Sequence, residues 1–214
     1  MDTPSEPLLK SVTLEGFLSF GNQPAEIQLS SLNVIIGPNG SGKSNFIEAL
    51  SVMRAVPRDL PLPIRRGGGV KEWLWNGDGE VDNARIELVL SEGHIAHEAV
   101  RYRLVFGSAG GSFQVVDERI ENARSTGANQ KPYFYFGYEN GRPTLNVSKD
   151  ADQYPGRELR REDVDPTQSI LSQRKDPERY PELAKLSDAL GQIRIYRSWQ
   201  FGPDAPFRMA CRAD

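Results

Sequence analysis

Eight consecutive residues, from Gly37 to Ser44, match the pattern G-x-x-x-x-G-K-[ST] in full. Glycines in such a loop let the backbone curl so that successive N–H groups face one point, which creates a binding site for anions. The side chain of Lys43 adds a mobile positive charge that can reach the β- and γ-phosphates of a nucleotide. The hydroxyl of Ser44 is a hard oxygen ligand suited to Mg²⁺. The pattern therefore predicts nucleotide binding, through the residues Gly37, Pro38, Asn39, Gly40, Ser41, Gly42, Lys43, Ser44 and Asn45.

Hydrolysis of a nucleotide would also require a carboxylate at a strand end to hold Mg²⁺ and a group to orient the attacking water. The candidates in this sequence are Asp117 and Glu118, which follow an apolar-leaning run beginning at Phe113. Gln114 interrupts that run and Arg119 follows it, so a hairpin strand with a solvated acidic end explains the same residues. Both interpretations remain open at this point.

Two elements must position the phosphate loop. The apolar run Leu32–Ile36 predicts a short buried strand that leads into it. From Lys43 to about Ala55 the apolar residues recur at helical spacing, which predicts an amphipathic helix whose positive N-terminal end faces the bound phosphate. Upstream, the alternation over 8–20 predicts a strand, and Ala25–Leu29 can pair back onto it.

The remainder of the chain is rich in strands. Glycine-containing turns separate several apolar runs, which is typical of an antiparallel meander; the expected strands are 84–91, 99–106, 113–122, 133–138 and 143–147. The prolines and glycines of 57–69 predict an irregular connection. Short helices are expected over 70–75, 167–173 and 181–191, and a closing strand over 193–199.

Composition limits the class of protein. With 214 residues, one domain is the first expectation, and 26 Lys+Arg against 29 Asp+Glu give a net charge of −3, which does not suggest a mainly basic nucleic-acid-coating protein. The single cysteine, Cys211, forbids an internal disulfide and a cysteine-based zinc site. The N-terminus lacks the pattern of a secretory signal, and no apolar run approaches the roughly 18 residues of a membrane helix, so we expect a cytoplasmic protein with no membrane partner.

Three lesser features have ordinary interpretations. His94 and His97 could suggest a metal site, but residues three apart on a strand face opposite sides, which favours surface histidines. The aromatic run Tyr133–Phe136 could stack nucleic-acid bases, although packing within the sheet is the better interpretation. Trp73, Trp75 and Trp199 are expected to be core or interface anchors.

The phosphate loop, with Asn45-Phe46 and Glu48-Ala49-Leu50 after it and Leu14–Phe20 before it, resembles the head domain of the RecF/SMC-like, OLD-like ATPases, an ABC-type branch of the P-loop fold. The resemblance implies an α/β fold: the N-terminal lobe of such a head, with a mixed sheet, an antiparallel β-meander and few helices. It would extend over 1–214, with a phosphate-loop region at 8–56, a strand region at 81–148 and a helical region at 167–199. The implied cofactors are ATP and Mg²⁺.

The resemblance also implies a glutamine that touches Mg²⁺ and the water near the γ-phosphate. Gln168 and Gln173 are the positions similar to it, and Gln168 is slightly favoured, as a catalytic residue beside Lys43 and as a metal ligand beside Ser44. Arg65-Arg66 is similar to a basic loop that approaches nucleotide or DNA in these heads. A solvated turn explains those arginines equally well.

Such heads have a C-terminal lobe with a signature motif, a strand ending in Asp-Glu and a switch histidine, and none of these is evident in this sequence. We therefore expect the C-terminal lobe to be absent, and the chain alone to bind ATP with little or no hydrolysis. A homodimer or a second chain would supply the missing lobe, and DNA would be engaged through a parent protein acting in DNA repair, recombination or anti-phage defence. The alternatives are a self-sufficient small NTPase using Asp117 and Glu118, and a non-hydrolysing, ATP-dependent interaction module.

Overall fold

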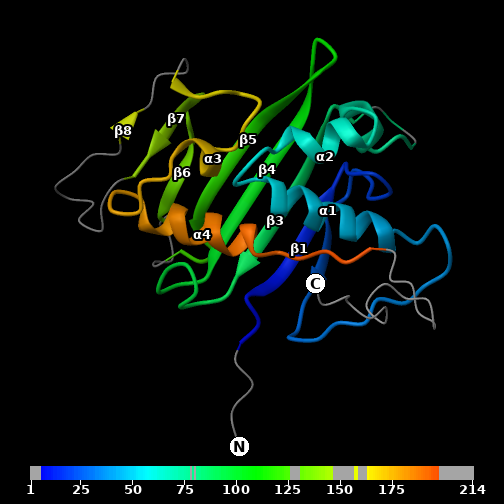
Figure 1. Cartoon of the computed structure of the whole chain (residues 1–214), viewed down its shortest axis with the longest axis horizontal. Helices are drawn as coiled ribbons and strands as arrows, with labels where there is room; N and C mark the ends of the chain where they lie inside the picture. The colour runs from blue at the N-terminus through cyan, green and yellow to red at the C-terminus, as the bar shows by residue number, and fades with distance from the viewer. Residues whose placement is uncertain are drawn as a thin grey trace, which may run out of the picture.

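A computed structural model describes residues 6–77, 79, 81–125, 131–146, 157–158 and 163–197. Its strands form one sheet of eight in the order β2-β1-β3-β4-β5-β6-β7-β8, and every neighbouring pair is antiparallel (Figure 1). The strands are β1 (Leu9–Glu15), β2 (Ala25–Gln28), β3 (Asn83–Leu90), β4 (Val100–Ala109), β5 (Ser112–Asn122), β6 (Phe134–Glu139), β7 (Arg142–Leu145) and β8 (Arg157–Glu158).

The helices gather on one face of this sheet, where they form a second layer (Figure 1). They are α1 (Lys43–Ala55), α2 (Pro61–Arg66), the 3₁₀ helix η1 (Val70–Trp73), α3 (Ile170–Gln173) and α4 (Pro181–Gly191). Helix α1 crosses the strands in the middle of the layer and buries one face, including Phe46, Ala49, Val52 and Met53. The apolar stripe of α4 is buried beside it, so one core lies between sheet and helices.

The alternation of residue types along β3 and β4 assigns the two faces of the sheet. Every second residue of β3 from Ala84 to Leu90 and of β4 from Val100 to Phe106 is apolar and buried, and opposite pairs such as Ile86 and Leu104 contribute to the core. The intervening residues point to the other face and form ion pairs across strands, for example Arg103 with Asp117 at 3.2 Å. This period of two is the pattern of a sheet that packs against helices on one side only.

The expected antiparallel meander is confirmed, but the expected mixed sheet is not observed within the described residues. Leu32–Ile36 forms no strand; the side chains of Leu32, Val34 and Ile36 are 84%, 80% and 86% exposed. A strand needs a hydrogen-bonding neighbour, and β1 already has β2 on one edge and β3 on the other. β1 therefore has no free edge for this run, and the run does not pair with the outer edge of β2, which is free in the described sheet.

Two further expectations were wrong in detail. The segment 193–197 has no strand structure; it runs along the outside of α1 (Figure 1). The connection 57–69 contains helix α2, whose first turn holds both Pro61 and Pro63. Prolines are compatible with that position because the first N–H groups of a helix need no intrahelical acceptor.

Candidate nucleotide-binding site

The phosphate loop owes its shape to its glycines. Gly40 and Gly42 have φ angles of 83° and 88°, in the left-handed region where a side chain would be strained. A Cβ atom on Gly37 would lie 2.7 Å from the Oγ of Ser41, so the loop also closes too tightly there for a larger residue. The chain then enters α1 directly at Lys43, with Gly42 as the N-cap.

The ammonium of Lys43 lies in the mouth of the loop. Its Nζ donates hydrogen bonds to the carbonyl oxygens of Gly37 at 2.8 Å and Pro38 at 2.6 Å, and approaches the Oγ of Ser41 at 3.3 Å. The lysine thus holds the curled loop together and keeps its positive charge where a phosphate would bind.

The first turn of α1 offers unpaired donors beside this charge. Among the described residues no acceptor contacts the backbone N–H groups of Gly42, Lys43, Ser44 or Asn45, and no acidic side chain lies in the first turn. The hydroxyl-bearing Ser44 is exposed at the same end of the helix. Open N–H groups, the positive end of a 13-residue helix and an ammonium therefore converge on one anion-binding position.

The turn between β1 and β2 supports the loop from the side. A Cβ atom on Gly42 would lie 3.0 Å from the Oγ of Ser19 and 3.5 Å from the ring of Phe20. The turn is itself tight: the backbones of Phe17 and Phe20 exchange two hydrogen bonds, and Leu18 has a positive φ of 49°. The sequence predicted a strand over 8–20 and a resemblance through Leu14–Phe20, but no spacing in it places this turn against Gly42.

The structure does not bring the two candidate glutamines to the phosphate loop. The Oε1 of Gln168 accepts a hydrogen bond from the backbone N–H of Leu60, beyond the C-terminal end of α1. A helix of 13 residues is about 20 Å long at 1.5 Å per residue, so the length of α1 separates Gln168 from Ser44. Gln173 is turned inward, and its amide contacts backbone groups of Asp165 and Gln168. In this conformation neither glutamine can share a metal ion with Ser44.

Asp117 and Glu118 lie on opposite faces of β5 and have separate roles. Asp117 pairs with Arg103 on the charged face. Glu118 is 2% exposed and accepts hydrogen bonds from the hydroxyls of Tyr102 and Ser169 and, at 2.9 Å, from the N–H of Ile170. Burial raises the pKa of Glu118 above its usual value, although the three donors act in the opposite direction. Glu118 is thus neither a solvated strand end nor an open metal ligand, because it fastens the start of α3 to the sheet.

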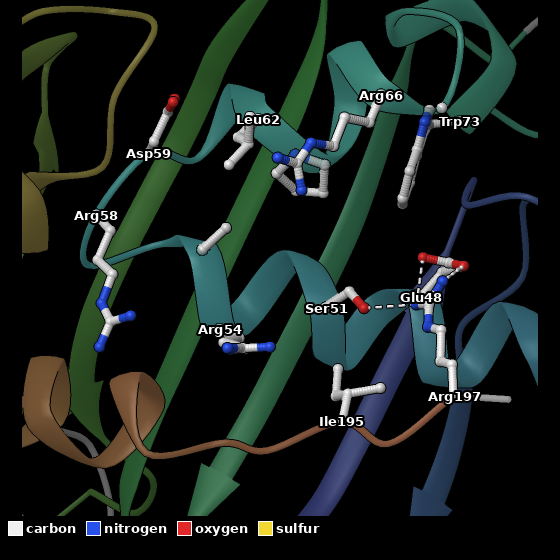
Figure 2. A pocket seen from close by; sticks show the side chains of 13 residues that line it. Glu48, Ser51, Arg54, Arg58, Asp59, Leu62, Arg66, Trp73, Ile195 and Arg197 are labelled. Carbon is white, nitrogen blue, oxygen red and sulfur yellow. Dashed lines mark hydrogen bonds and ion pairs between the residues drawn. The ribbon is translucent and has the colours of Figure 1, made fainter. Parts of the chain in front are cut away.

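Arginines line the outer side of α1 and α2, as Figure 2 shows. Arg197 forms a bidentate pair with Glu48, at 2.6 and 2.9 Å, and also donates to the Oγ of Ser51 at 2.7 Å. This pairing raises the pKa of Arg197 and fixes the segment 193–197 across α1. Of the two arginines that resemble a basic loop, Arg65 pairs with Asp59 at 3.0 Å, whereas Arg66 lines the hollow.

The lesser sequence features have structural roles. His94 and His97 are both exposed, and the described part of the chain contains no group of three or more His, Cys, Asp or Glu that could hold a metal ion. Of the three tryptophans expected to be anchors, Trp73 is buried in the core, Trp75 is half-buried and Trp199 lies outside the described residues. Tyr135, from the aromatic run, is also buried in the core. No helix of the described residues is long and apolar enough to cross a bilayer.

Comparison with known proteins identifies relatives of this chain. The family model described as "AAA domain, putative AbiEii toxin, Type IV TA system" matches residues 32–204. Chromosome partition protein Smc of Coxiella burnetii is 36% identical over 99 residues, which cover 44% of this chain and 8% of that protein. Structural maintenance of chromosomes protein 3 of Arabidopsis thaliana is 32% identical over 132 residues, covering 60% of this chain and 9% of that protein.

A solved structure from work on ATP-driven dimerization and DNA stimulated activation of SMC ATPases has a TM-score of 0.44 at 23% identity, covering 56% of this chain and 73% of that one. The expected relationship to SMC-like ATPases is confirmed by the family model and the SMC sequences. The chain spans less than a tenth of the length of the two SMC relatives.

Proposed function

The chain belongs to the AAA-domain family that its residues 32–204 match, and from this premise we propose that it binds ATP together with Mg²⁺ through Gly37–Ser44. It is a P-loop ATPase domain related to the SMC proteins. The finer assignment, an N-terminal lobe of a larger ATPase head, is our proposal.

One observation carries the proposal for ATP. The ammonium of Lys43 lies within 2.8 Å of two loop carbonyls, directly in front of the open N–H groups of the first turn of α1. When the γ-phosphate arrives, the lysine can exchange these carbonyls for phosphate oxygens with a small side-chain movement, because its stem is flexible. The backbone of the loop is already curled, with positive φ angles at Gly40 and Gly42.

Ser44 is the residue we assign to Mg²⁺. Its hydroxyl is exposed in the first turn of α1, beside the position of the phosphates. Bound Mg²⁺ would neutralise charge on the phosphate oxygens. The protein's own contribution is to orient the phosphates through Lys43 and the N–H groups and to present one hydroxyl oxygen.

Hydrolysis, in this proposal, depends on groups from another lobe or another copy of the chain. Asp117 and Glu118 are both engaged by side chains remote from the loop, which weighs against a self-sufficient NTPase. The exposed apolar run Leu32–Ile36 supports the same proposal, because an added strand would cover it and complete a sheet next to the loop. The partner is a second lobe or a second chain.

For the whole protein we propose a role in DNA repair, recombination or anti-phage defence. Two relatives are named for chromosome partition and maintenance, and the family description names a toxin–antitoxin system. DNA would then be engaged by the assembled protein.

Equilibrium binding of a fluorescent ATP analogue, with and without Mg²⁺, tests the proposal. We expect saturable binding by the wild type and a loss of at least tenfold in affinity for Lys43→Ala, because both the charge and the loop closure are removed. Ser44→Ala should retain binding without Mg²⁺ but lose the gain in affinity that Mg²⁺ gives. Lys71→Ala, which removes an exposed lysine outside the loop, is the matched control.

Thermal unfolding of each variant shows whether it is folded, so that a loss of binding can be assigned to the loop and not to misfolding. Equal affinity of the wild type and a folded Lys43→Ala variant would refute the assignment of the loop. Steady-state turnover per chain that does not rise with chain concentration and disappears in Lys43→Ala would refute the requirement for another lobe or another copy, and would leave ATP binding intact as a conclusion.

A further inference from the structure

A pocket of about 800 Å³ lies on the outer side of the helical layer, between α1 and α2 (Figure 2). Its walls come from the C-terminal half of α1, the connection after it, helix α2 and the segment that holds Arg197. We call it the arginine pocket after Arg54, Arg58 and Arg66, the three guanidinium groups that line it and have no ion-pair partner among the described residues.

The charges of the arginine pocket do not balance. Its two carboxylates are already neutralised: Glu48 by Arg197, and Asp59 by Arg65, which lies just outside. Arg54, Arg58 and Arg66 therefore remain as three uncompensated positive charges in a chain whose net charge is −3. The three like charges make the electrostatic potential of this hollow positive, and a bound anion would lower the repulsion among them.

Phosphate is the anion that this arrangement fits. Guanidinium groups present planar pairs of N–H donors that match two phosphate oxygens at once, and arginine is weakly hydrated compared with lysine, so it exchanges water for phosphate readily. Arg54 and Arg58 come from the end of α1 and the turn after it, and Arg66 from the end of α2 across the pocket. Donors from separate elements can hold several phosphates of one ligand.

We infer that the arginine pocket is a second binding site for a phosphate-bearing polyanion, distinct from the nucleotide loop. Arg54 lies ten residues beyond Ser44 on the same helix, which corresponds to about 15 Å at 1.5 Å per residue. The phosphates can belong to a nucleic-acid backbone or to a free polyphosphate, and both present the same chemistry to the pocket.

The test uses the full chain carrying Lys43→Ala, so that the nucleotide loop does not contribute. The probes are inorganic tripolyphosphate, followed by calorimetry, and a fluorescein-labelled single-stranded DNA of 15 nucleotides, followed by anisotropy. In this background Arg54→Gln/Arg58→Gln is compared with Arg124→Gln/Lys131→Gln, which removes two exposed positive charges elsewhere. Circular dichroism of both variants checks that the fold is retained.

We expect Arg54→Gln/Arg58→Gln to weaken binding at least tenfold and the control pair to change it less than twofold. For DNA, the slope of log K against log salt should fall by about 1.4, since each phosphate contact contributes about 0.7 for single strands. A loss with both probes supports a general polyphosphate site, a loss with DNA alone a nucleic-acid site, and a loss with tripolyphosphate alone a site for a free polyphosphate. Equal affinities of the two double variants, or no binding of either probe, would overturn the inference while leaving ATP binding at the loop untouched.

Discussion

Replacing Glu118 with alanine should be among the most damaging single changes in this chain. The carboxylate of Glu118 lies inside the protein and accepts hydrogen bonds from the hydroxyls of Tyr102 and Ser169 and from the N–H of Ile170. Ser169 in turn accepts from the N–H of Leu171, so Glu118 organises the whole beginning of α3. Glu118→Ala leaves these buried donors without an acceptor.

The expected cost follows from those contacts. A buried donor left unsatisfied costs roughly 1–3 kcal/mol, and three are affected. Removing the carboxylate also relieves the cost of keeping it away from water, which offsets part of the sum. We expect a net loss of about 3 kcal/mol in the free energy of unfolding, equivalent to about 6–12 °C in Tm for a chain of this size.

Urea unfolding at pH 7 measures that loss, and amide hydrogen exchange locates it. The N–H groups of Ile170 and Leu171 should exchange faster in Glu118→Ala, because the acceptor of the first is gone and the acceptor of the second, Ser169, is no longer held. Glu178→Ala, which changes an exposed glutamate, is the control. A loss below about 1 kcal/mol with unchanged exchange at these two amides would refute the argument.

The pKa of Glu118 adds a pH dependence to the same experiment. Burial raises this pKa above the usual value of 4.5, so between the unfolded and folded values the native state binds more protons than the unfolded state. The extra stability that comes from the protonated form of Glu118 is therefore fully present below the unfolded pKa and is lost as pH rises through the folded pKa. Glu118→Gln cannot titrate, so the unfolding free energy of the wild type minus that of Glu118→Gln should be larger at pH 4 than at pH 7. An increase from pH 4 to pH 7 would show the opposite shift.

Two other predictions concern the phosphate loop and the segment before it. Gly42→Ala should weaken ATP binding at least tenfold while the chain still folds. The reason is that φ is 88° at this position and that a Cβ would lie 3.0 Å from the Oγ of Ser19. Binding of ATP equal to that of the wild type would contradict this prediction. The wild type should self-associate at high concentration through Leu32–Ile36, and Val34→Lys/Ile36→Lys should shift it toward monomer in light scattering; a monomeric wild type would contradict it.

Local patterns were sufficient to predict most of the described elements. The helix from Lys43 to Ala55 and the helix from Pro181 to Gly191 follow from apolar spacing, and the meander follows from alternating strands separated by glycine turns. The strands of the meander pair with their neighbours in sequence, and each helix shows its buried face in its own apolar spacing, so periodicity and turn chemistry are enough to predict these elements.

The side chains whose surroundings the sequence did not predict, those of Gln168 and Glu118, contact partners that are distant in sequence. Gln168 was assigned to the metal by resemblance, yet its side chain contacts Leu60, 108 residues away in sequence. Glu118 looked like the solvated end of a strand because the sequence does not reveal that Ser169 and Ile170, about 50 residues later, cover it. Spacing along one segment cannot identify a contact that another segment completes.

Leu32–Ile36 differs from both groups, because its sequence and its environment disagree. Its composition is that of a buried strand, while three of its side chains are at least 80% exposed. Within the described residues this is a local conflict between pattern and burial, and such conflicts are expected where a surface is meant for another element. The conflict lies directly before the phosphate loop, so whatever covers Leu32–Ile36 also stiffens the loop from its N-terminal side. Completion of the sheet and organisation of the nucleotide site should therefore be coupled, and ATP affinity should rise when that surface is covered.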